Sequence, residues 1–403
     1  MTTRESQRFH TLRERIAASP DAILVLVVLV IFMDMMIYGL LIPVFPEYAP
    51  RLGVDESVLG VVFGVYAAML FLFSIPMGLL SDRVGRRPLI VVGMFLLAGA
   101  TALFGFSTSV THLFIARMVQ GVSAAATWSA GLALLADITD PSRLGERMGI
   151  ALSAVGLGTV LGPVVGGLLF EYLGYVATFL IPAAVVATVG LLVLAVPVRS
   201  CKREGDRERA GMLPRGALLP LAACAATTVA VSGTYGVLDP YLPVYLHAAF
   251  SASPATIGLV FAVLAIAAAI AQPTAGRIYD RYGGSRYLIG GGLLLSGAAI
   301  FAAMQAPTLP LVAVAILALG VTLSSALVPM MPIMAGIYRD QDSQGVAYGI
   351  YNTFFSIGLA LGPFAGAALL GHYPLPAIFL LQAGVLGVMG VLGCLLIGRL
   401  GWR

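Results

Sequence analysis

Two acidic residues lie inside long apolar stretches of this sequence, where carboxylates are uncommon. Asp34 is about twelve residues into the stretch 22–47, and Asp239 lies in a later stretch, within GVLDPYLPVY. An apolar environment disfavours the anionic form of a carboxylate, so such a group takes up a proton or an organic cation. Because both ligands compete for the same charge, one buried carboxylate can exchange one ligand for the other. Either residue could instead be a structural acid, held by hydroxyl or amide groups.

Aromatic and sulfur-containing side chains occur in the same apolar stretches as the two acids. The face of an aromatic ring attracts a cation, by ~2 kcal/mol or more when the cation is desolvated. A single such residue more often packs against neighbours or faces lipid, but the set around two carboxylates favours an amphipathic cationic substrate. The candidate binding residues besides Asp34 and Asp239 are Tyr38, Tyr66, Trp128, Tyr235, Tyr241, Met331, Tyr351, Asn352 and Phe355.

The composition indicates a membrane protein built from helices. Of the 403 residues, 59% are hydrophobic and 10% are charged, against roughly 25% charged in soluble proteins. Apolar stretches recur along the chain, each long enough to cross ~30 Å of hydrocarbon as a helix. A porin-like barrel would show short alternating segments instead. We predict an all-α integral membrane protein with twelve transmembrane helices, at about 22–47, 57–80, 88–108, 112–136, 146–171, 175–197, 216–246, 255–277, 286–304, 309–337, 343–370 and 375–399.

Positive charges predict the orientation of these helices. Of the 23 Lys and Arg residues, 21 fall in the termini or in alternate connections between predicted helices. Since positively charged connections stay in the cytoplasm, we place both termini there, in the inner membrane of a bacterium. The net charge of +4 reflects this bias and gives no support to nucleic-acid binding.

The two halves of the sequence resemble each other at an offset near 198 residues. PVFPEY at 43–48 matches PYLPVY at 240–245, and three further motifs match in the same order. Duplicated halves around a central cavity are a transporter design, with the site near the bilayer midplane. We predict a cytoplasmic segment 1–21, six-helix halves at 22–197 and 216–403, and a charged linker at 198–215.

A predicted cytoplasmic turn carries the pattern GLLSDRVGRR, from Gly78 to Arg87. Gly78 and Gly85 permit a tight turn and a close helix approach. Asp82 can accept hydrogen bonds from a helix N-terminus or an arginine and so form a latch.

This pattern includes Arg83 and Arg86, and a weaker copy contains Gly276 and Asp280. These residues resemble the loop signature of the major facilitator superfamily, and the resemblance implies that superfamily's two-half fold. A plain positively charged anchor is the alternative explanation.

The fifth predicted helix carries small residues along one face, with Gly158, Gly162, Pro163 and Gly166. Small residues spaced by four let two backbones come close, and the proline bends the helix. The pattern resembles the antiporter signature of the drug-exporting branch of the superfamily, which implies exchange rather than uptake. Ordinary helix packing is the alternative, as for the similar glycines of 343–370.

Arg117 lies in the apolar stretch 112–136, followed by Gln120 and Gly121. A buried arginine costs at least ~2.5–3.5 kcal/mol on insertion scales, so it should have a partner inside the protein. The sequence ARMVQG resembles the superfamily's signature in its fourth helix, where the resemblance implies a role in proton coupling. A structural tie to backbone carbonyls is the alternative.

Several segments are similar to the vesicular monoamine transporters and their bacterial drug-antiporter relatives. They include DMMIYGLLIPVFP from Asp34, VLDPYLPVY at 237–245 and YGIYNTFFSIGLALGP at 348–363. This resemblance implies that Asp34 holds the substrate ammonium and that Asp239 is a second acidic site.

The sequence also departs from that family. Tyr66 stands where the family has a lysine, and Leu327 and Asn352 stand where it has acids. The long connection after the first helix is missing, so we do not expect a vesicular role, and the proton stoichiometry does not carry over. Tetracycline and phenicol exporters share much of the same pattern.

We therefore expect a proton-coupled antiporter that exports amphipathic organic cations by alternating access, with Asp34 as the shared site. We expect the proton gradient to drive it without a cofactor or metal. We also expect the chain to be a monomer, and we do not expect it to be an enzyme. The open alternatives are an exporter of tetracycline- or phenicol-like drugs, a proton symporter and, in another class, a channel.

Overall fold

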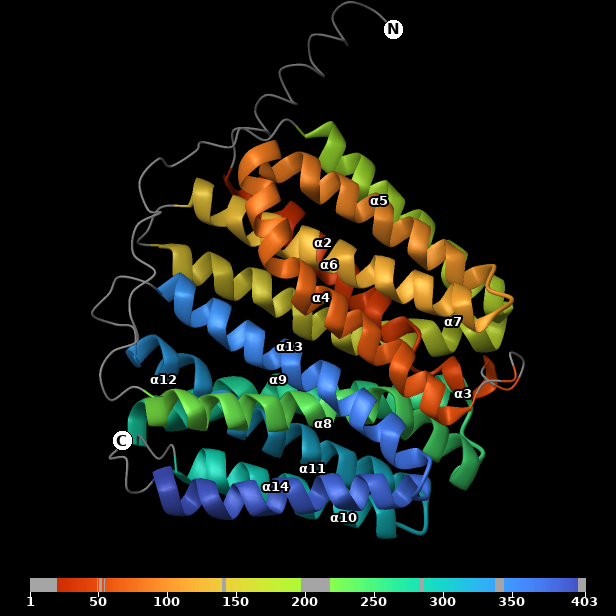
Figure 1. Cartoon of the computed structure of the whole chain (residues 1–403), viewed down its shortest axis with the longest axis vertical. Helices are drawn as coiled ribbons and strands as arrows, with labels where there is room; N and C mark the ends of the chain where they lie inside the picture. The colour runs from red at the N-terminus through yellow and green to blue at the C-terminus, as the bar shows by residue number, and fades with distance from the viewer. Residues whose placement is uncertain are drawn as a thin grey trace, which may run out of the picture. The chain divides into compact units, whose positions relative to one another are not determined.

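A computed structural model describes residues 20–48, 50, 53, 55–139, 143–196, 218–282, 286–337 and 344–397. The predicted linker 198–215 and all but the last two residues of the predicted segment 1–21 lie outside these ranges. In the described residues the regular structure is helical (Figure 1). The elements are α2 (Pro20–Leu40), α3 (Phe45–Tyr48), α4 (Glu56–Val84), α5 (Arg86–Gly105), α6 (Val110–Ile138), α7 (Leu144–Ala195), α8 (Leu218–Phe250), α9 (Pro254–Tyr282), η3 (Tyr287–Gly291), α10 (Gly292–Gln305), α11 (Leu309–Leu327), α12 (Met330–Ile337), α13 (Gln344–Leu370) and α14 (Leu375–Ile397).

The described helices confirm the predicted membrane-spanning segments. Eleven of them are long and apolar enough to cross a bilayer. One of these, α7, has 52 residues, which is about 78 Å of helix and more than twice the thickness of the hydrocarbon core. Gly174 interrupts it with φ 77° and ψ 178°, a conformation that is open to glycine. Therefore α7 is two of the twelve predicted spans, joined at Gly174.

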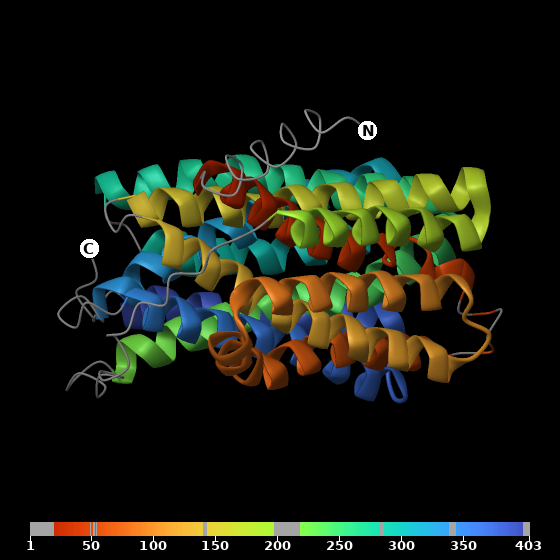
Figure 2. The same ribbon diagram turned by 90° about the horizontal axis from the view of Figure 1, so that it is seen from above.

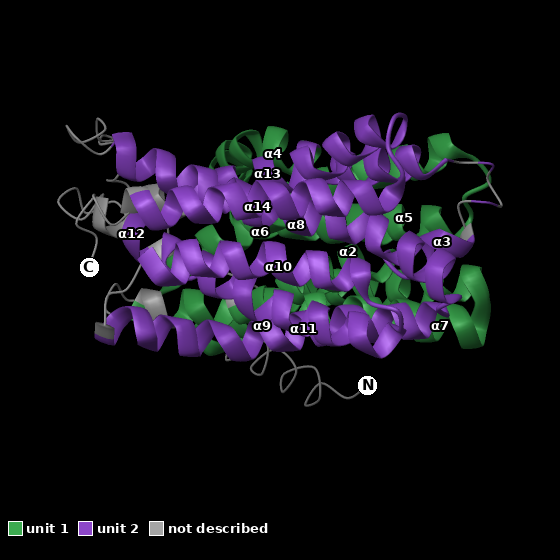
Figure 3. Cartoon of the chain, turned by 90° about the horizontal axis from the view of Figure 1, so that it is seen from below, with its two compact units in different colours: residues 1–41, 69–206 green, residues 42–68, 207–403 purple. Residues whose placement is uncertain are grey.

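The described chain forms two compact units (Figure 3). The first contains Met1–Leu41 and Met69–Asp206, and the second contains Ile42–Ala68 and Arg207–Arg403. The segment 42–68 thus groups with the C-terminal helices, although it belongs to the N-terminal half of the sequence. The predicted division into halves at 22–197 and 216–403 stays a prediction.

Within each unit the helices lie side by side along a common direction (Figure 2). In the first unit α2 packs against α7 and α6, and α5 packs against the same two helices. In the second unit α8 packs against α13, α9 against α11, and α10 against both α11 and α14.

The glycine face of α7 lies directly against the backbone of α2. A Cβ atom on Gly158 would lie 2.6 Å from the Cβ of Met35, and one on Gly162 would lie 2.6 Å from the carbonyl oxygen of Met36. A Cβ on Gly166 would overlap the carbonyl of Leu40. Without a hydrophobic driving force between helices in lipid, such close backbone approach is a main source of attraction. These glycines therefore hold α2 in place.

The second unit repeats this packing with α8 and α13. The glycines of α13 at 358, 362 and 366 lie against α8, where a Cβ on any of them would overlap atoms of that helix. A Cβ on Gly236 would lie 2.7 Å from the Cδ of Pro363, as one on Gly39 would lie 2.8 Å from the Cδ of Pro163. Packing alone thus accounts for both glycine patterns, and the exchange direction implied by the antiporter resemblance stays a prediction.

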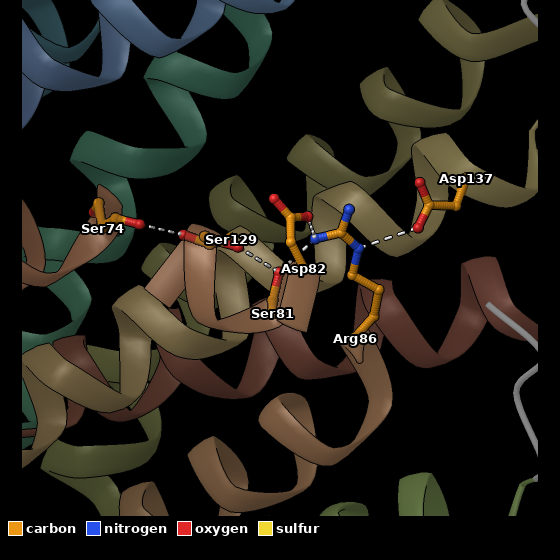
Figure 4. Close-up of polar contacts among 7 residues, drawn as sticks. Ser74, Ser81, Asp82, Arg86, Ser129 and Asp137 are labelled. Atoms are coloured by element: carbon orange, nitrogen blue, oxygen red, sulfur yellow. Dashed lines mark hydrogen bonds and ion pairs between the residues drawn. The ribbon is translucent and has the colours of Figure 1, made fainter. Parts of the chain in front are cut away.

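The turn between α4 and α5 forms the predicted Asp82 latch (Figure 4). Gly85 makes the turn with φ 97°, in the region that favours glycine. The Arg86 guanidinium lies 2.5 Å from an Asp82 carboxylate oxygen and 3.1 Å from Oδ2 of Asp137 on α6. Asp137 was not among the residues singled out from the sequence. Among the residues that the structure describes, a Cβ on Gly78 would find no atom within 4 Å, so the close helix approach expected there is not seen.

The weaker copy of this pattern in α9 is less enclosed. Asp280 is exposed, and a Cβ on Gly276 would come no nearer than 3.8 Å, to Cγ1 of Val328.

We expect Gly166→Ala to destabilise the protein, because the new methyl group would overlap the Leu40 carbonyl. Overpacking of this kind costs about 1–3 kcal/mol. The matched control is Gly156→Ala in the same helix, where a Cβ would meet nothing within 4 Å, and where alanine should stabilise the helix slightly. Thermal unfolding in detergent measures both. Equal melting temperatures for the two variants would show that the glycine face does not hold α2.

We expect Arg86→Gln to loosen the junction of α4, α5 and α6, because it removes a guanidinium that pairs with two half-buried carboxylates. Loss of a hydrogen bond to a charged group costs about 1.5–3 kcal/mol. Arg83→Gln is the control, since Arg83 belongs to the same turn but is exposed. The readout is again the melting temperature. An Arg86→Gln protein as stable as Arg83→Gln would contradict the latch.

Candidate substrate and proton site

Asp34 lies in the middle of α2 and is 1% exposed. Its neighbours Met35 and Met36 lie against the glycines of α7, so the backbone that carries the acid is fixed. The indole Nε1–H of Trp128, on α6, donates a hydrogen bond of 2.9 Å to Oδ2 of Asp34. The structure therefore brings together two of the residues predicted from the sequence. In this contact Trp128 donates a hydrogen bond to the acid, whereas the sequence led us to predict that the face of its ring would contact a substrate cation.

Arg117 is also on α6 and is fully buried. Its Nη1 donates a hydrogen bond of 3.1 Å to Oε1 of Gln120. Its guanidinium carbon lies 5.2 Å from the centre of the Tyr38 ring and 5.8 Å from that of Phe104. Cation–π contacts of this kind stabilise a desolvated charge. These contacts are with side chains, and the alternative tie of Arg117 to backbone carbonyls stays a prediction.

The hydrogen-bonded chain continues from Gln120 into α5. Nε2 of Gln120 lies 3.5 Å from Oγ1 of Thr101, and that hydroxyl donates a 2.7 Å hydrogen bond to the Leu97 carbonyl. Thr101 and Phe104 were not singled out from the sequence. A threonine within an apolar helix was the available signal for the first, and nothing distinguished the second from other apolar residues.

Helices α2 and α6 are thus joined at two places in the first unit. Asp34 contacts Trp128, and Tyr38, one turn further along α2, contacts Arg117. One buried carboxylate and one buried guanidinium lie on facing helices, with aromatic rings against both. This arrangement can hold an anion in a dry environment and offer it to a small cation or a proton.

Asp239 lies on α8 in the second unit and is 7% exposed. It belongs to a run of buried residues from Gly236 to Val244. Tyr235 is one helical turn before it, on the same face. The match of PVFPEY with PYLPVY makes Tyr235 the counterpart of Tyr38. The acid therefore precedes its tyrosine by one turn in α2 and follows it by one turn in α8.

Tyr241 is packed inside the second unit. It is fully buried, and its hydroxyl donates a 2.8 Å hydrogen bond to the Pro363 carbonyl. A Cβ on Gly60 of α4 or on Gly366 of α13 would overlap its side chain. These contacts give Tyr241 a packing role between α4, α8 and α13, and its predicted contact with substrate stays a prediction.

The remaining predicted binding residues also belong to the second unit. Tyr66 is 2% exposed on α4, and Tyr351 is 9% exposed on α13, with its ring centre 6.2 Å from that of Phe355. Asn352 is exposed. Met331 lies on α12, with its side chain outside the described part of the structure. These residues belong to a different compact unit from Asp34.

Comparison with known proteins agrees with this architecture. A family model of the Major Facilitator Superfamily matches residues 27–223 and 223–400. The MFS-type transporter SLC18B1 of Rattus norvegicus is 28% identical over 359 residues, covering 83% of this chain and 77% of that protein. The synaptic vesicular amine transporter of Homo sapiens is 28% identical over 321 residues, covering 78% of this chain and 62% of that protein.

Solved structures show the same fold. A crystal structure of a bacterial homologue of the human lysosomal transporter Spinster superimposes with a TM-score of 0.79 at 16% identity, covering 94% of this chain and 97% of that one. With the family model matching nearly the whole length and the membrane-spanning helices in place, the chain belongs to the major facilitator superfamily and is a multi-pass membrane transporter.

Proposed function

We propose that this transporter is a proton-coupled antiporter that exports amphipathic organic cations, with Asp34 as the site shared by proton and substrate. The observation that carries the proposal is the buried carboxylate itself, 1% exposed in a membrane helix and held by Trp128. A carboxylate in such a place destabilises the protein, because hydrocarbon solvates no charge. Its presence there therefore indicates a function.

The surroundings of Asp34 favour a cation as its ligand. A carboxylate attracts a cation directly, and the nearby ring of Tyr38 adds apolar contact area for an amphipathic molecule. The name of the synaptic vesicular relative refers to an amine, and amines are cations at neutral pH. The likeness to that relative supports the same substrate class for this chain, without identifying the substrate.

Exchange follows from competition at a single charge. In our proposal the cation binds the Asp34 anion from the cytoplasm, and a proton arriving from outside neutralises the carboxylate and releases the cation. Loss of that proton to the cytoplasm restores the anion. The two halves expose the site alternately, as in other transporters of duplicated design. The glycine contacts make α2 and α7 move together.

The same proposal places the chain in a bacterial inner membrane as a monomer, with both termini in the cytoplasm and with the proton gradient as its energy source. The distribution of Lys and Arg supports this orientation.

We expect Asp34→Asn to abolish cation-driven proton flux in proteoliposomes, because the amide can neither bind a proton nor pair with an ammonium. Loss of a charge-assisted contact should weaken cation binding about 10- to 100-fold. Wild-type cation affinity should fall as the pH falls, since protons compete for Asp34, and the variant should lose this dependence.

The control for this test is Asp55→Asn, which removes the same charge from an exposed position. Asp239→Asn tests the second acid, and we expect a smaller loss than at Asp34. If Asp34→Asn exchanges cations as fast as wild type, the shared-site mechanism is wrong. Uncharged tetracycline- or phenicol-like compounds that drive proton flux better than cations would favour the alternative exporter class.

We expect Gly60→Ala to open the end of the second unit at which α4 packs on Tyr241, because a methyl group there would overlap the tyrosine. Alternating access requires this packing to form and to part. The probe is Val62→Cys, at a fully buried position, in a protein whose own cysteines are replaced by alanine. A membrane-impermeant maleimide should label it faster with Gly60→Ala than with Gly99→Ala, where a Cβ has open space. Equal labelling rates would contradict this role of the Gly60 contact.

A further inference from the structure

The hydrogen bond between Trp128 and Asp34 is held in place from both sides. On α6, the residue before Trp128 is Thr127, whose Cγ2 lies 2.6 Å from where a Cβ on Gly93 of α5 would be. The residue after it is Ser129, whose hydroxyl donates a 3.1 Å hydrogen bond to the Ser74 carbonyl of α4 (Figure 4). The backbone at Trp128 is therefore anchored to two neighbouring helices.

The anchoring continues one turn earlier on α6. Ser123 is fully buried, and its hydroxyl donates a 2.7 Å hydrogen bond to the Gly93 carbonyl. Asp34, for its part, is carried by the stretch of α2 that lies against the glycines of α7. Donor and acceptor thus both stand on packed helices, which fixes their geometry before any ligand binds.

The chemistry of the indole group gives this contact a direction. The indole Nε1–H only donates, so its partner must accept. A carboxylate anion accepts more strongly than a protonated carboxyl group, because the bond is then charge-assisted. A donor aimed at Oδ2 therefore favours the anion of Asp34, against the effect of burial, which favours the acid.

Other charged and titratable groups stand on the helices that pack against α2. Arg117 contacts the ring of Tyr38, which lies one turn along α2 from Asp34. The rest lie toward the helix ends or at the break of α7 at Gly174: Arg86 and Arg87 on α5, His112 and Asp137 on α6, and Arg147, Glu171, Tyr172 and Tyr175 on α7. Arg147 forms an ion pair with Asp21 at 2.6 Å. Asp21 is thirteen residues, or about 20 Å, along α2 from Asp34.

We propose that Trp128 is a positioning residue that fixes the Asp34 carboxylate through its indole N–H and thereby sets the pH at which the proton yields to the substrate cation. This inference rests on the proposed function of Asp34. The sequence led us to predict that the ring face of Trp128 contacts the substrate cation. We propose instead that Trp128 acts as a hydrogen-bond donor to the acid.

The first test uses the full-length chain in detergent and needs no substrate. Trp128 and Trp402 are the two tryptophans of the sequence, so Trp402→Phe leaves Trp128 as the only indole. Its fluorescence should change as the pH is lowered and Asp34 takes up a proton, and adding Asp34→Asn should remove the change. The same emission titration with and without Asp34→Asn would overturn the proposal, even if the protein transports nothing.

The second test separates the donor from the ring. Trp128→Phe keeps an aromatic face without the N–H, and Trp128→Gln keeps an N–H donor without the ring. We measure how pH affects binding of tetraphenylphosphonium, a lipophilic cation that has no proton to lose. The midpoint should move up by about one pH unit in Trp128→Phe, because the anion has lost a charge-assisted hydrogen bond. Trp128→Gln should stay nearer to wild type.

The opposite ranking, with Trp128→Phe like wild type and Trp128→Gln shifted, would overturn the proposal and favour a ring face for the cation. Equal, unshifted midpoints in both variants would overturn it as well. Absence of cation-driven proton flux in wild type would instead count against the proposed function, and the fluorescence titration would still decide whether Trp128 reports the protonation of Asp34.

Discussion

The desolvation of charge is the constraint on which the rest of this structure depends. A carboxylate and a guanidinium, Asp34 and Arg117, are buried in helices that must lie in hydrocarbon, where a single charge costs about 2.5–3.5 kcal/mol or more. Each is stabilised across the same pair of helices, the acid by the indole N–H of Trp128 and the cation by the ring of Tyr38, while Gln120 contacts the cation from its own helix. The contacts that make burial tolerable also fix the position of the acid, so stability and the proposed function depend on the same few atoms.

Such contacts require helices whose positions do not drift, and in lipid the hydrophobic effect does not bring helices together. Close backbone approach supplies the attraction instead. In the first unit the glycines of α7 lie on α2, and in the second unit the glycines of α13 lie on α8 in the same register. The polar contacts of α6 with α4 and α5, through Ser129 and Ser123, fix the opposite side of the Asp34 contact. A carboxylate between two such anchored helices has little freedom to turn, so in the proposed mechanism a proton or a cation meets it in a defined orientation.

Much of this architecture could be predicted from the sequence, because it depends on local or repeated patterns. The spans follow from hydropathy, the break at Gly174 from length, and the helix pairs from small residues spaced by four. Contacts between distant residues could not be predicted in the same way. The Arg86–Asp137 pair joins positions 51 residues apart, and hydropathy does not say which acid an arginine meets. Trp128 was predicted as a ring because composition reveals a side chain's type but not which of its atoms points at the acid. The space around Gly78 depends on which helix lies opposite, and sequence spacing alone does not supply that.

Counterpart residues in the two halves of the repeat agree where they pack helices together and differ at the two acids. Counterparts in the repeat share the roles that hold helices together: Gly39 and Gly236 each contact a proline, and Tyr38 and Tyr235 occupy the same place. The acids do not follow the repeat, since Asp34 corresponds to Val231 and Asp239 corresponds to Ile42. Only residues that act on a ligand need differ between two halves that share one fold, because packing constrains the others equally in both. The departure of the acids from a repeat that retains the packing around them therefore agrees with the proposed site for one small ligand. In the proposed mechanism a single acid, Asp34, binds one proton or one cation at a time, whereas a symmetric pair of acids would bind both.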